Sequence, residues 1–140
     1  MNLSRDDALE RFSSARVARL ATVNAEGQPH LVPVTFTLWG AAIVMAIDHK
    51  PKATTHLKRL RNIKETGRVS LLADDYDDQD WSRLWWVRID GTAHIVDDEQ
   101  ERAEQVARLC AKYGQYSDKP PTGPVIRVDI GALTGWAYRS

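Results

Sequence analysis

Two strand-like runs joined by a turn decide the fold of this chain: Ala15-Arg-Val-Ala-Arg-Leu-Ala-Thr-Val-Asn24, then Ala25-Glu-Gly27, then Pro29-His-Leu-Val-Pro-Val-Thr-Phe-Thr-Leu38. Apolar residues fall at every second position of the second run, the period of a strand with one buried face: Val32, Val34, Phe36 and Leu38. Asn24 to Gly27 has the composition of a turn, and Gly27 is free to adopt a positive φ. Pro33 has no N–H to donate, so we expect it on an edge strand or at a bulge.

Further strands are predicted on both sides of this hairpin. Gly40 turns the chain into residues 41–47, and the remaining strands are expected at residues 68–74, 83–96, 125–130 and 136–138. A helix is expected from the Ser4 cap to about Ser13, and a second one in the basic segment that follows residue 47. A third is expected from Glu99 to Tyr113, with an apolar stripe formed by Ala103, Val106, Ala107 and Cys110. Residues 114–124 read as a loop. These elements predict an antiparallel barrel with helices packed outside it, and a parallel βαβ fold is less consistent with them.

The composition restricts the classes of function. A chain of 140 residues suits one domain, and it has no apolar run near the roughly 20 residues of a membrane helix. The start of the chain lacks a signal-peptide pattern, and one cysteine, Cys110, fits a reducing cytoplasm. Nineteen basic residues balance nineteen acidic ones, so no general attraction to nucleic acid is expected. We therefore expect a cytoplasmic protein with no nucleic-acid or membrane partner.

A basic segment follows the third predicted strand. It runs from His49 to Lys64 without an acidic residue. A strand end rich in lysines and hydroxyls at the start of a helix favours phosphate, because free N–H groups and the helix dipole add to the lysine charge. We assign ligand contact to Lys50, Lys52, Thr54 and Thr55. The other four basic side chains are expected to point to solvent: Lys58, Arg59, Arg61 and Lys64.

The remaining candidates are aromatic. Trp85 and Trp86 are adjacent, so on a strand they face opposite sides. One can pack in the core, while the other meets solvent, a partner chain or a flat ligand, and Arg88 shares the face of Trp86. The histidines are not spaced as metal ligands, so no metal site is expected. A conspicuous general acid or base is missing, which fits a protein whose cofactor performs the chemistry.

Four segments together resemble a known family. The hairpin from Arg16 to Phe36 is similar to the opening of the pyridoxamine 5′-phosphate oxidase-like split β-barrel flavoproteins (FMN-binding split barrel, PNPOx-like). His49-Lys-Pro-Lys52, Arg68-Val-Ser-Leu-Leu72 and Leu84-Trp-Trp-Val-Arg-Ile-Asp-Gly-Thr-Ala93 resemble the actinobacterial branch that uses the deazaflavin coenzyme F420. The resemblance implies a mainly β, single-domain split barrel over residues 1–140. It also implies a homodimeric oxidoreductase that passes hydride between coenzyme F420 and a small organic acceptor.

The resemblance also implies roles for particular residues. The cofactor would bind at the dimer interface, with its ring near the barrel strand and its phosphate at the basic segment. Its binding residues are expected to be Val32, Pro33, Val34, Lys50, Pro51, Lys52, Thr54, Thr55, Lys58, Trp85, Trp86 and Arg88. Residues 30–34 lack the arginine with which true pyridoxamine phosphate oxidases hold phosphate, so that substrate is not expected. Two alternatives remain open: an FMN-binding flavoprotein of the same fold, and a protein that stores the cofactor without turnover.

Overall fold

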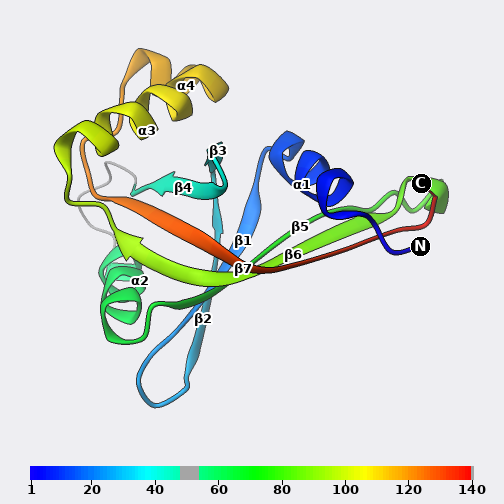
Figure 1. The fold of residues 1–140 in the computed structure, drawn as a ribbon, viewed down its shortest axis with the longest axis horizontal. Coiled ribbons are helices and arrows are strands. Elements are labelled where there is room, and N and C mark those ends of the chain that lie inside the picture. Colours follow the sequence, from blue (N-terminus) through cyan, green and yellow to red (C-terminus); the bar gives the residue numbers. More distant parts are fainter. Residues whose placement is uncertain (48–53, 140) are drawn as a thin grey trace.

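The computed structural model describes residues 1–47 and 54–139, and of residues 54–57 it describes the backbone alone. Lys50, Pro51 and Lys52 therefore lie outside the described residues. The described strands form one antiparallel sheet in the order β2-β1-β5-β6-β7-β4-β3 (Figure 1). Their bounds are β1 Ala18–Val23, β2 Pro29–Val34, β3 Thr37–Trp39, β4 Ala42–Ala46, β5 Arg68–Asp75, β6 Trp85–Ile95 and β7 Val125–Ala137. The sheet curls into a half-barrel, which confirms the predicted mainly β class.

The opening hairpin has the predicted form. β1 pairs with β2 in a register that places Leu20 opposite Val32, and Gly27 in the turn has φ 84°. The side-chain oxygen of Asn24 accepts hydrogen bonds from the backbone N–H groups of Glu26 and Gln28, which fixes the turn. β2 is the outermost strand of the sheet, so Pro33 removes no bond of the ladder, and the edge position is confirmed.

Two strand boundaries were wrong. The second strand ends at Val34 instead of continuing to Leu38, and the chain then forms the short strand β3, which pairs with β4. The change of direction buries Phe36 completely between the two strands, where it contacts Phe12 of the first helix. The two strands expected at the end of the chain are a single strand, β7, which stays paired with β6 through an irregularity at Asp90 and Gly91.

The helices are α1 Arg5–Ser14, α2 Thr54–Glu65, α3 Glu99–Lys112 and α4 Gly114–Asp118, with a 3₁₀ turn at Trp81–Arg83. Ser4 caps α1 by accepting a hydrogen bond from Asp7 N, and Asp98 caps α3. The residues predicted as a loop contain α4. The predicted stripe on α3 was partly wrong: Ala103 and Ala107 are exposed, and the buried residues are Gln105 and Leu109. No helix of the described chain is long and apolar enough to cross a membrane.

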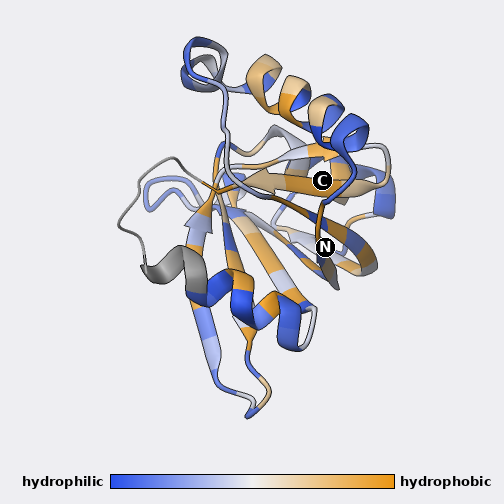
Figure 2. Ribbon diagram, turned by 90° about the vertical axis from the view of Figure 1, so that its left-hand side faces the viewer, coloured by the Kyte–Doolittle hydropathy of each residue, from blue (hydrophilic) through white to orange (hydrophobic). Residues whose placement is uncertain are grey.

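The two faces of the sheet differ in burial. Side chains on the inner face, among them Leu20, Leu71 and Ile89, are fully buried and form the core with Phe12 of α1. Figure 2 shows apolar and hydrophilic residues alternating along the strands, as a sheet with one buried face requires. The outer face nevertheless carries exposed apolar side chains, including Leu31 (66% exposed) on β2 and Leu72 (40%) on β5.

Candidate functional site

A cavity of about 330 Å³ opens where the end of β2 meets the end of β4 and three helices. It is lined by Pro33, Val34, Thr35, Ala46, Arg59, Tyr113, Gln115 and Tyr116. The strands contribute an apolar wall, whereas α2, α4 and the end of α3 contribute a guanidinium, an amide and two phenols. Small-molecule sites commonly combine an apolar surface with a few converging polar groups, and this cavity has both.

The end of α3 is attached to the sheet by the hydroxyl of Tyr113. This oxygen accepts a hydrogen bond from the backbone N of Phe36 at 3.1 Å and lies 3.0 Å from the carbonyl oxygens of both Phe36 and Arg16. Burial raises the pKa of Tyr113, so the phenol stays protonated at neutral pH. The backbone groups of Phe36 and Arg16 occupy the hydrogen-bonding positions of this hydroxyl. We therefore assign Tyr113 the role of holding the end of α3 in place at the cavity wall.

Tyr116 makes a different contact. Its hydroxyl lies 2.9 Å from the hydroxyl of Thr35, which is in the short connection between β2 and β3. Both side chains are half-buried, and both line the cavity. The backbone oxygen of Tyr116 accepts a hydrogen bond from Cys110 Sγ at 3.2 Å. The pair therefore joins α4 to the strand connection at the wall of the cavity.

Arg59 is the charged residue of this wall. Its side chain is buried, at 7% exposed, and Nε has no hydrogen-bond partner among the described residues. Burial lowers the pKa of Arg59, and no carboxylate among the described residues raises it. The prediction that Arg59 faces solvent was wrong, although Lys58, Arg61 and Lys64 are exposed as expected. A buried cation without a counter-ion is unfavourable, and an anionic ligand in the cavity would relieve the cost.

Two uncharged polar residues, Asn62 and His30, lie near Arg59. Asn62, one turn along α2, donates a hydrogen bond to Thr22 Oγ1 at 3.1 Å, which docks the helix on β1. His30 pairs with Thr22 in the sheet, and its Nδ1 is buried without a partner among the described residues. Burial, followed by the charges of Lys58 and Arg59, lowers the pKa of His30, so its ring is neutral at pH 7. The ring is therefore able to donate or accept one further hydrogen bond.

The structure brings some of the predicted site residues together. Pro33 and Val34 line the cavity, whereas Val32 points into the core and Lys58 is exposed on α2. Thr54 and Thr55 begin α2, where a phosphate site was predicted, but their side chains lie outside the described part.

The tryptophans are at another place in the fold. Trp85 pairs with Ala137 near the chain termini and packs against the core. Trp86 is half-buried on the outer face, where the guanidinium of Arg88 lies 5.9 Å from its ring centre. Neither tryptophan lines the cavity of the same chain.

Several cavity residues were not predicted: Thr35, Ala46, Arg59 as a wall residue, Tyr113, Gln115 and Tyr116. A signal existed for Arg59, because Arg59, Asn62 and Ile63 follow the i, i+3, i+4 spacing of a buried helix face. The spacing of Tyr113 and Tyr116 also places two phenols on one side of a helical turn. Nothing in the sequence indicates that they meet Thr35, which is about 80 positions earlier.

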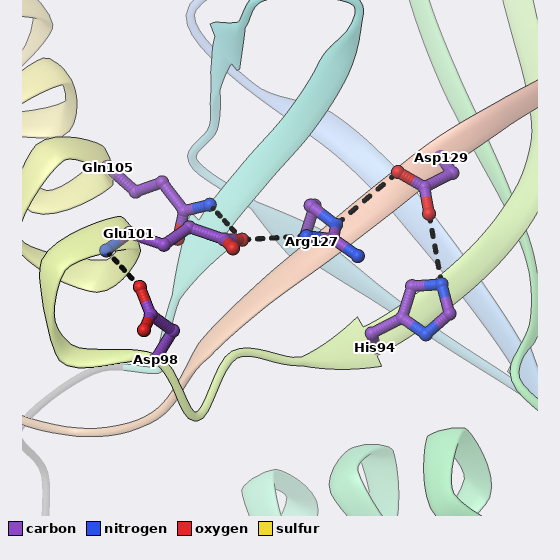
Figure 3. A network of polar contacts seen from close by, with 6 residues as sticks. All are labelled: His94, Asp98, Glu101, Gln105, Arg127 and Asp129. Atoms are coloured by element: carbon purple, nitrogen blue, oxygen red, sulfur yellow. Dashed lines mark hydrogen bonds and ion pairs between the residues drawn. The ribbon is translucent and has the colours of Figure 1, made fainter.

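A second polar cluster lies between α3 and β7 (Figure 3). Arg127 contacts Glu101 at 2.8 Å and Asp129 at 3.4 Å, and Asp129 also contacts His94 at 3.0 Å. Gln105 donates a hydrogen bond to the same Glu101 oxygen at 2.8 Å. Because the opposite charges in this cluster are already paired, we assign it to the docking of α3 on the sheet. The described residues include no group of three or more His, Cys, Asp or Glu side chains placed to hold a metal ion.

Comparison with known proteins gives the same fold. A profile described as pyridoxamine 5′-phosphate oxidase matches residues 5–137. The chain resembles the FAD-binding protein from Mycobacterium smegmatis, with a TM-score of 0.69 at 20% identity, covering 100% of this chain and 99% of the other. It also resembles HutZ, the heme storage protein from Vibrio cholerae, with a TM-score of 0.71 at 18% identity and 94% coverage of each chain.

A curated relative is similar in sequence over a shorter stretch. It is the 5a,11a-dehydrotetracycline/5a,11a-dehydrooxytetracycline reductase of Streptomyces rimosus subsp. rimosus, 35% identical over 78 residues. The match covers 56% of this chain and 54% of the reductase, so it spans about half the length of each. The profile match is broader and covers nearly all the secondary structure described above. By that match, this chain belongs to the pyridoxamine 5′-phosphate oxidase family.

Proposed function

We propose that this protein is an oxidoreductase that binds coenzyme F420 in the Arg59 cavity and uses it to reduce a small organic acceptor. The observation that carries the proposal is the buried guanidinium of Arg59, which has no carboxylate partner among the described residues. The tail of the deazaflavin is anionic, so its phosphate would place a negative charge beside this guanidinium. The reductase from Streptomyces rimosus, a relative over part of the chain, supports redox chemistry.

The residues present fit such a cofactor. Arg59 would contact the phosphate, and the basic segment before it would complete the site through Lys50, Lys52, Thr54, Thr55 and Lys58. The ring would lie against Pro33 and Val34, because these residues form the apolar wall of the cavity. When bound, the deazaflavin supplies a hydride. The chain itself would provide the apolar wall and the fixed polar groups that hold the hydride donor and the organic acceptor in contact.

We propose further that two copies assemble through the outer face of the sheet. This face presents Leu31, Leu72 and Trp86 beside the charged Arg88, and an exposed apolar patch of this kind marks interaction surfaces. Trp85 is occupied in the core of its own chain, so Trp86 is the better candidate to reach the cofactor of a partner. The single cysteine suits a reducing compartment, and we place the dimer in the cytoplasm.

Two other functions have specific support. An FMN- or FAD-dependent enzyme is favoured by the fold shared with the FAD-binding protein from Mycobacterium smegmatis. A storage protein without turnover is favoured by the fold shared with HutZ, which is named for heme storage. Since fold alone does not decide among these functions, the ligand has to be measured.

The test is a fluorescence titration of the full chain with coenzyme F420, FMN and FAD, at low and at high salt. Micromolar or tighter binding of F420 alone, weakened by salt, supports the proposal, since screening weakens contacts with charged groups. An Arg59→Met variant, which retains the aliphatic stem, is expected to bind F420 at least tenfold more weakly. Arg61→Met is the matched control, because Arg61 is exposed on the same helix. Binding of FMN or FAD alone, or of no cofactor, would refute the F420 assignment.

A further inference from the structure

The hydroxyls of Thr35 and Tyr116 form a pair at the wall of the Arg59 cavity. The two oxygens are 2.9 Å apart, and the two residues come from segments that only the fold brings together. Pro33 and Val34, which precede Thr35 directly, form the apolar wall of the same cavity. A molecule lying on this apolar wall would therefore have its edge beside the two hydroxyls.

The pair keeps one proton that is free to be donated. Each hydroxyl carries one proton, and only one of the two protons is used in the bond between the oxygens. Within the described part of the chain, neither hydroxyl has another hydrogen bond. The neighbouring Tyr113 differs, because its hydroxyl is engaged by the backbone of Phe36 and Arg16. The Thr35–Tyr116 pair thus offers a donor to the cavity, and the cavity wall contains no carboxylate among the residues described.

The position of Tyr116 is fixed by its surroundings. Tyr116 N donates to Tyr113 O at 3.1 Å, Cys110 Sγ donates to Tyr116 O at 3.2 Å, and the two tyrosine rings meet edge to face at 5.7 Å. A donor held in place before the ligand arrives needs little reorganisation to stabilise negative charge. Arg59 in the same wall adds positive potential.

We propose that the Thr35–Tyr116 pair binds an oxygen of the acceptor that bears or acquires negative charge, such as a phenolate or conjugated carbonyl oxygen. The inference rests on the proposed function for the identity of the hydride donor. In a conjugated carbonyl compound, hydride from the reduced deazaflavin forms a C–H bond at the far alkene carbon. The alkene electron pair moves toward the oxygen, the resulting enolate oxygen accepts the hydrogen bond, and a proton from water completes the saturated product. The chain thereby selects planar acceptors with an oxygen at the edge.

The test uses 4-hydroxybenzaldehyde, whose phenolate absorbs at a longer wavelength than its phenol. It is titrated into the full chain, without and with F420, across a pH series. The wild type is expected to bind the phenolate preferentially and to lower the apparent pKa of the bound ligand. Tyr116→Phe and Thr35→Val are each expected to lose at least tenfold in phenolate affinity and to lose this pKa shift. Thr35→Ser is expected to recover most of what Thr35→Val loses. Tyr138→Phe, at an exposed tyrosine outside the cavity, is the control.

The outcomes separate this inference from the proposed function. Phenolate binding that depends on Thr35 and Tyr116 supports the role of this pair in binding the acceptor oxygen. If F420 does not bind in the same experiment, only the cofactor assignment fails. Absence of phenolate binding by the wild type would overturn the inference. So would full retention of phenolate affinity and of the ligand pKa shift by a folded Tyr116→Phe variant, even if F420 binds normally.

Discussion

The ammonium group of Lys112 lies 3.9 Å from the centre of the Phe36 ring. It also donates a hydrogen bond to the backbone oxygen of Ser13 at 3.1 Å, while Arg16 donates to the backbone oxygen of Lys112 at 2.8 Å. These contacts join the end of α3 to the end of α1 and to the strand connection beside the cavity. The attachment of α3 is therefore mediated mainly by side chains, and it is open to test by substitution.

Lys112 should make stability depend on pH. Burial, aided by the charge of Arg16, lowers the pKa of Lys112 from 10.5 to about 8. Between these pH values the unfolded chain binds a proton that the folded chain has released. The free energy of unfolding from this group therefore rises with pH above about 8. Urea denaturation between pH 7.5 and 9.5 should show this rise in the wild type and not in Lys112→Met. If the free energies of unfolding of the two proteins changed with pH in parallel, the lowered pKa assigned to Lys112 would be contradicted.

Tyr113→Phe should destabilise the fold. The change removes one hydroxyl and leaves the N–H and carbonyl groups of Phe36 without their partner, which typically costs about 1–3 kcal/mol. Chemical denaturation should show a lower midpoint with an unchanged m-value. Tyr138→Phe is the control, and as an exposed substitution it should change the free energy of unfolding by less than about 0.5 kcal/mol. Equal stability of the two variants would count against the role given to Tyr113.

Gly91→Ala should be strongly destabilising. A Cβ at Gly91 would overlap the backbone oxygen of Asp129, so β6 and β7 would have to separate at their irregularity. We expect a loss of more than about 2 kcal/mol, in the range of overpacked sites. The matched control is Gly114→Ala, where a Cβ meets nothing within 4 Å. The comparison is made by thermal denaturation, and a Gly91→Ala protein as stable as the control would show that the strands relax freely.

Leu31→Lys should disrupt the proposed dimer without unfolding the chain. Leu31 is 66% exposed in the single chain, so a lysine there costs the monomer little, whereas burying it in an interface is unfavourable. Analytical ultracentrifugation should find a dimeric wild type and a monomeric variant of similar thermal stability. Tyr76→Lys, at a residue 60% exposed directly after β5, should remain dimeric. A variant that stays dimeric would exclude Leu31 from the interface.

Local sequence patterns predicted the strands well where one face is uniformly apolar. The β1–β2 hairpin and the edge position of Pro33 follow from alternation and from the missing N–H of proline. The face of α3 was harder to predict, because Gln105 is fully buried against Glu101, which in turn pairs with Arg127. A polar residue whose partners lie on another element looks like a surface residue in the sequence.

The candidate site shows the same limit. Arg59 was assigned to solvent because charged residues on helices are usually exposed, and only the packing of α2 in the folded chain shows that it is buried. Tyr113 and Tyr116 meet Thr35 and Phe36 through contacts that span about 80 positions. Pro33 and Val34 of the apolar wall were both among the predicted cofactor-binding residues, but that prediction came from the resemblance to the split-barrel family and not from the strand pattern.

The position of β2 has a consequence for how this protein avoids unwanted association. Pro29 and Pro33 are both in the outermost strand and four residues apart, so their nitrogen atoms face the same way, away from β1. Neither proline nitrogen carries a hydrogen. Leu31, halfway between the two prolines, is therefore the residue of this stretch whose backbone N–H can donate a hydrogen bond away from β1. The free edge is therefore a poor template for an added strand, which is the first step of amyloid-like stacking. Strand addition along β2 is therefore disfavoured, so a chance encounter between two copies at this edge does not grow into an extended sheet.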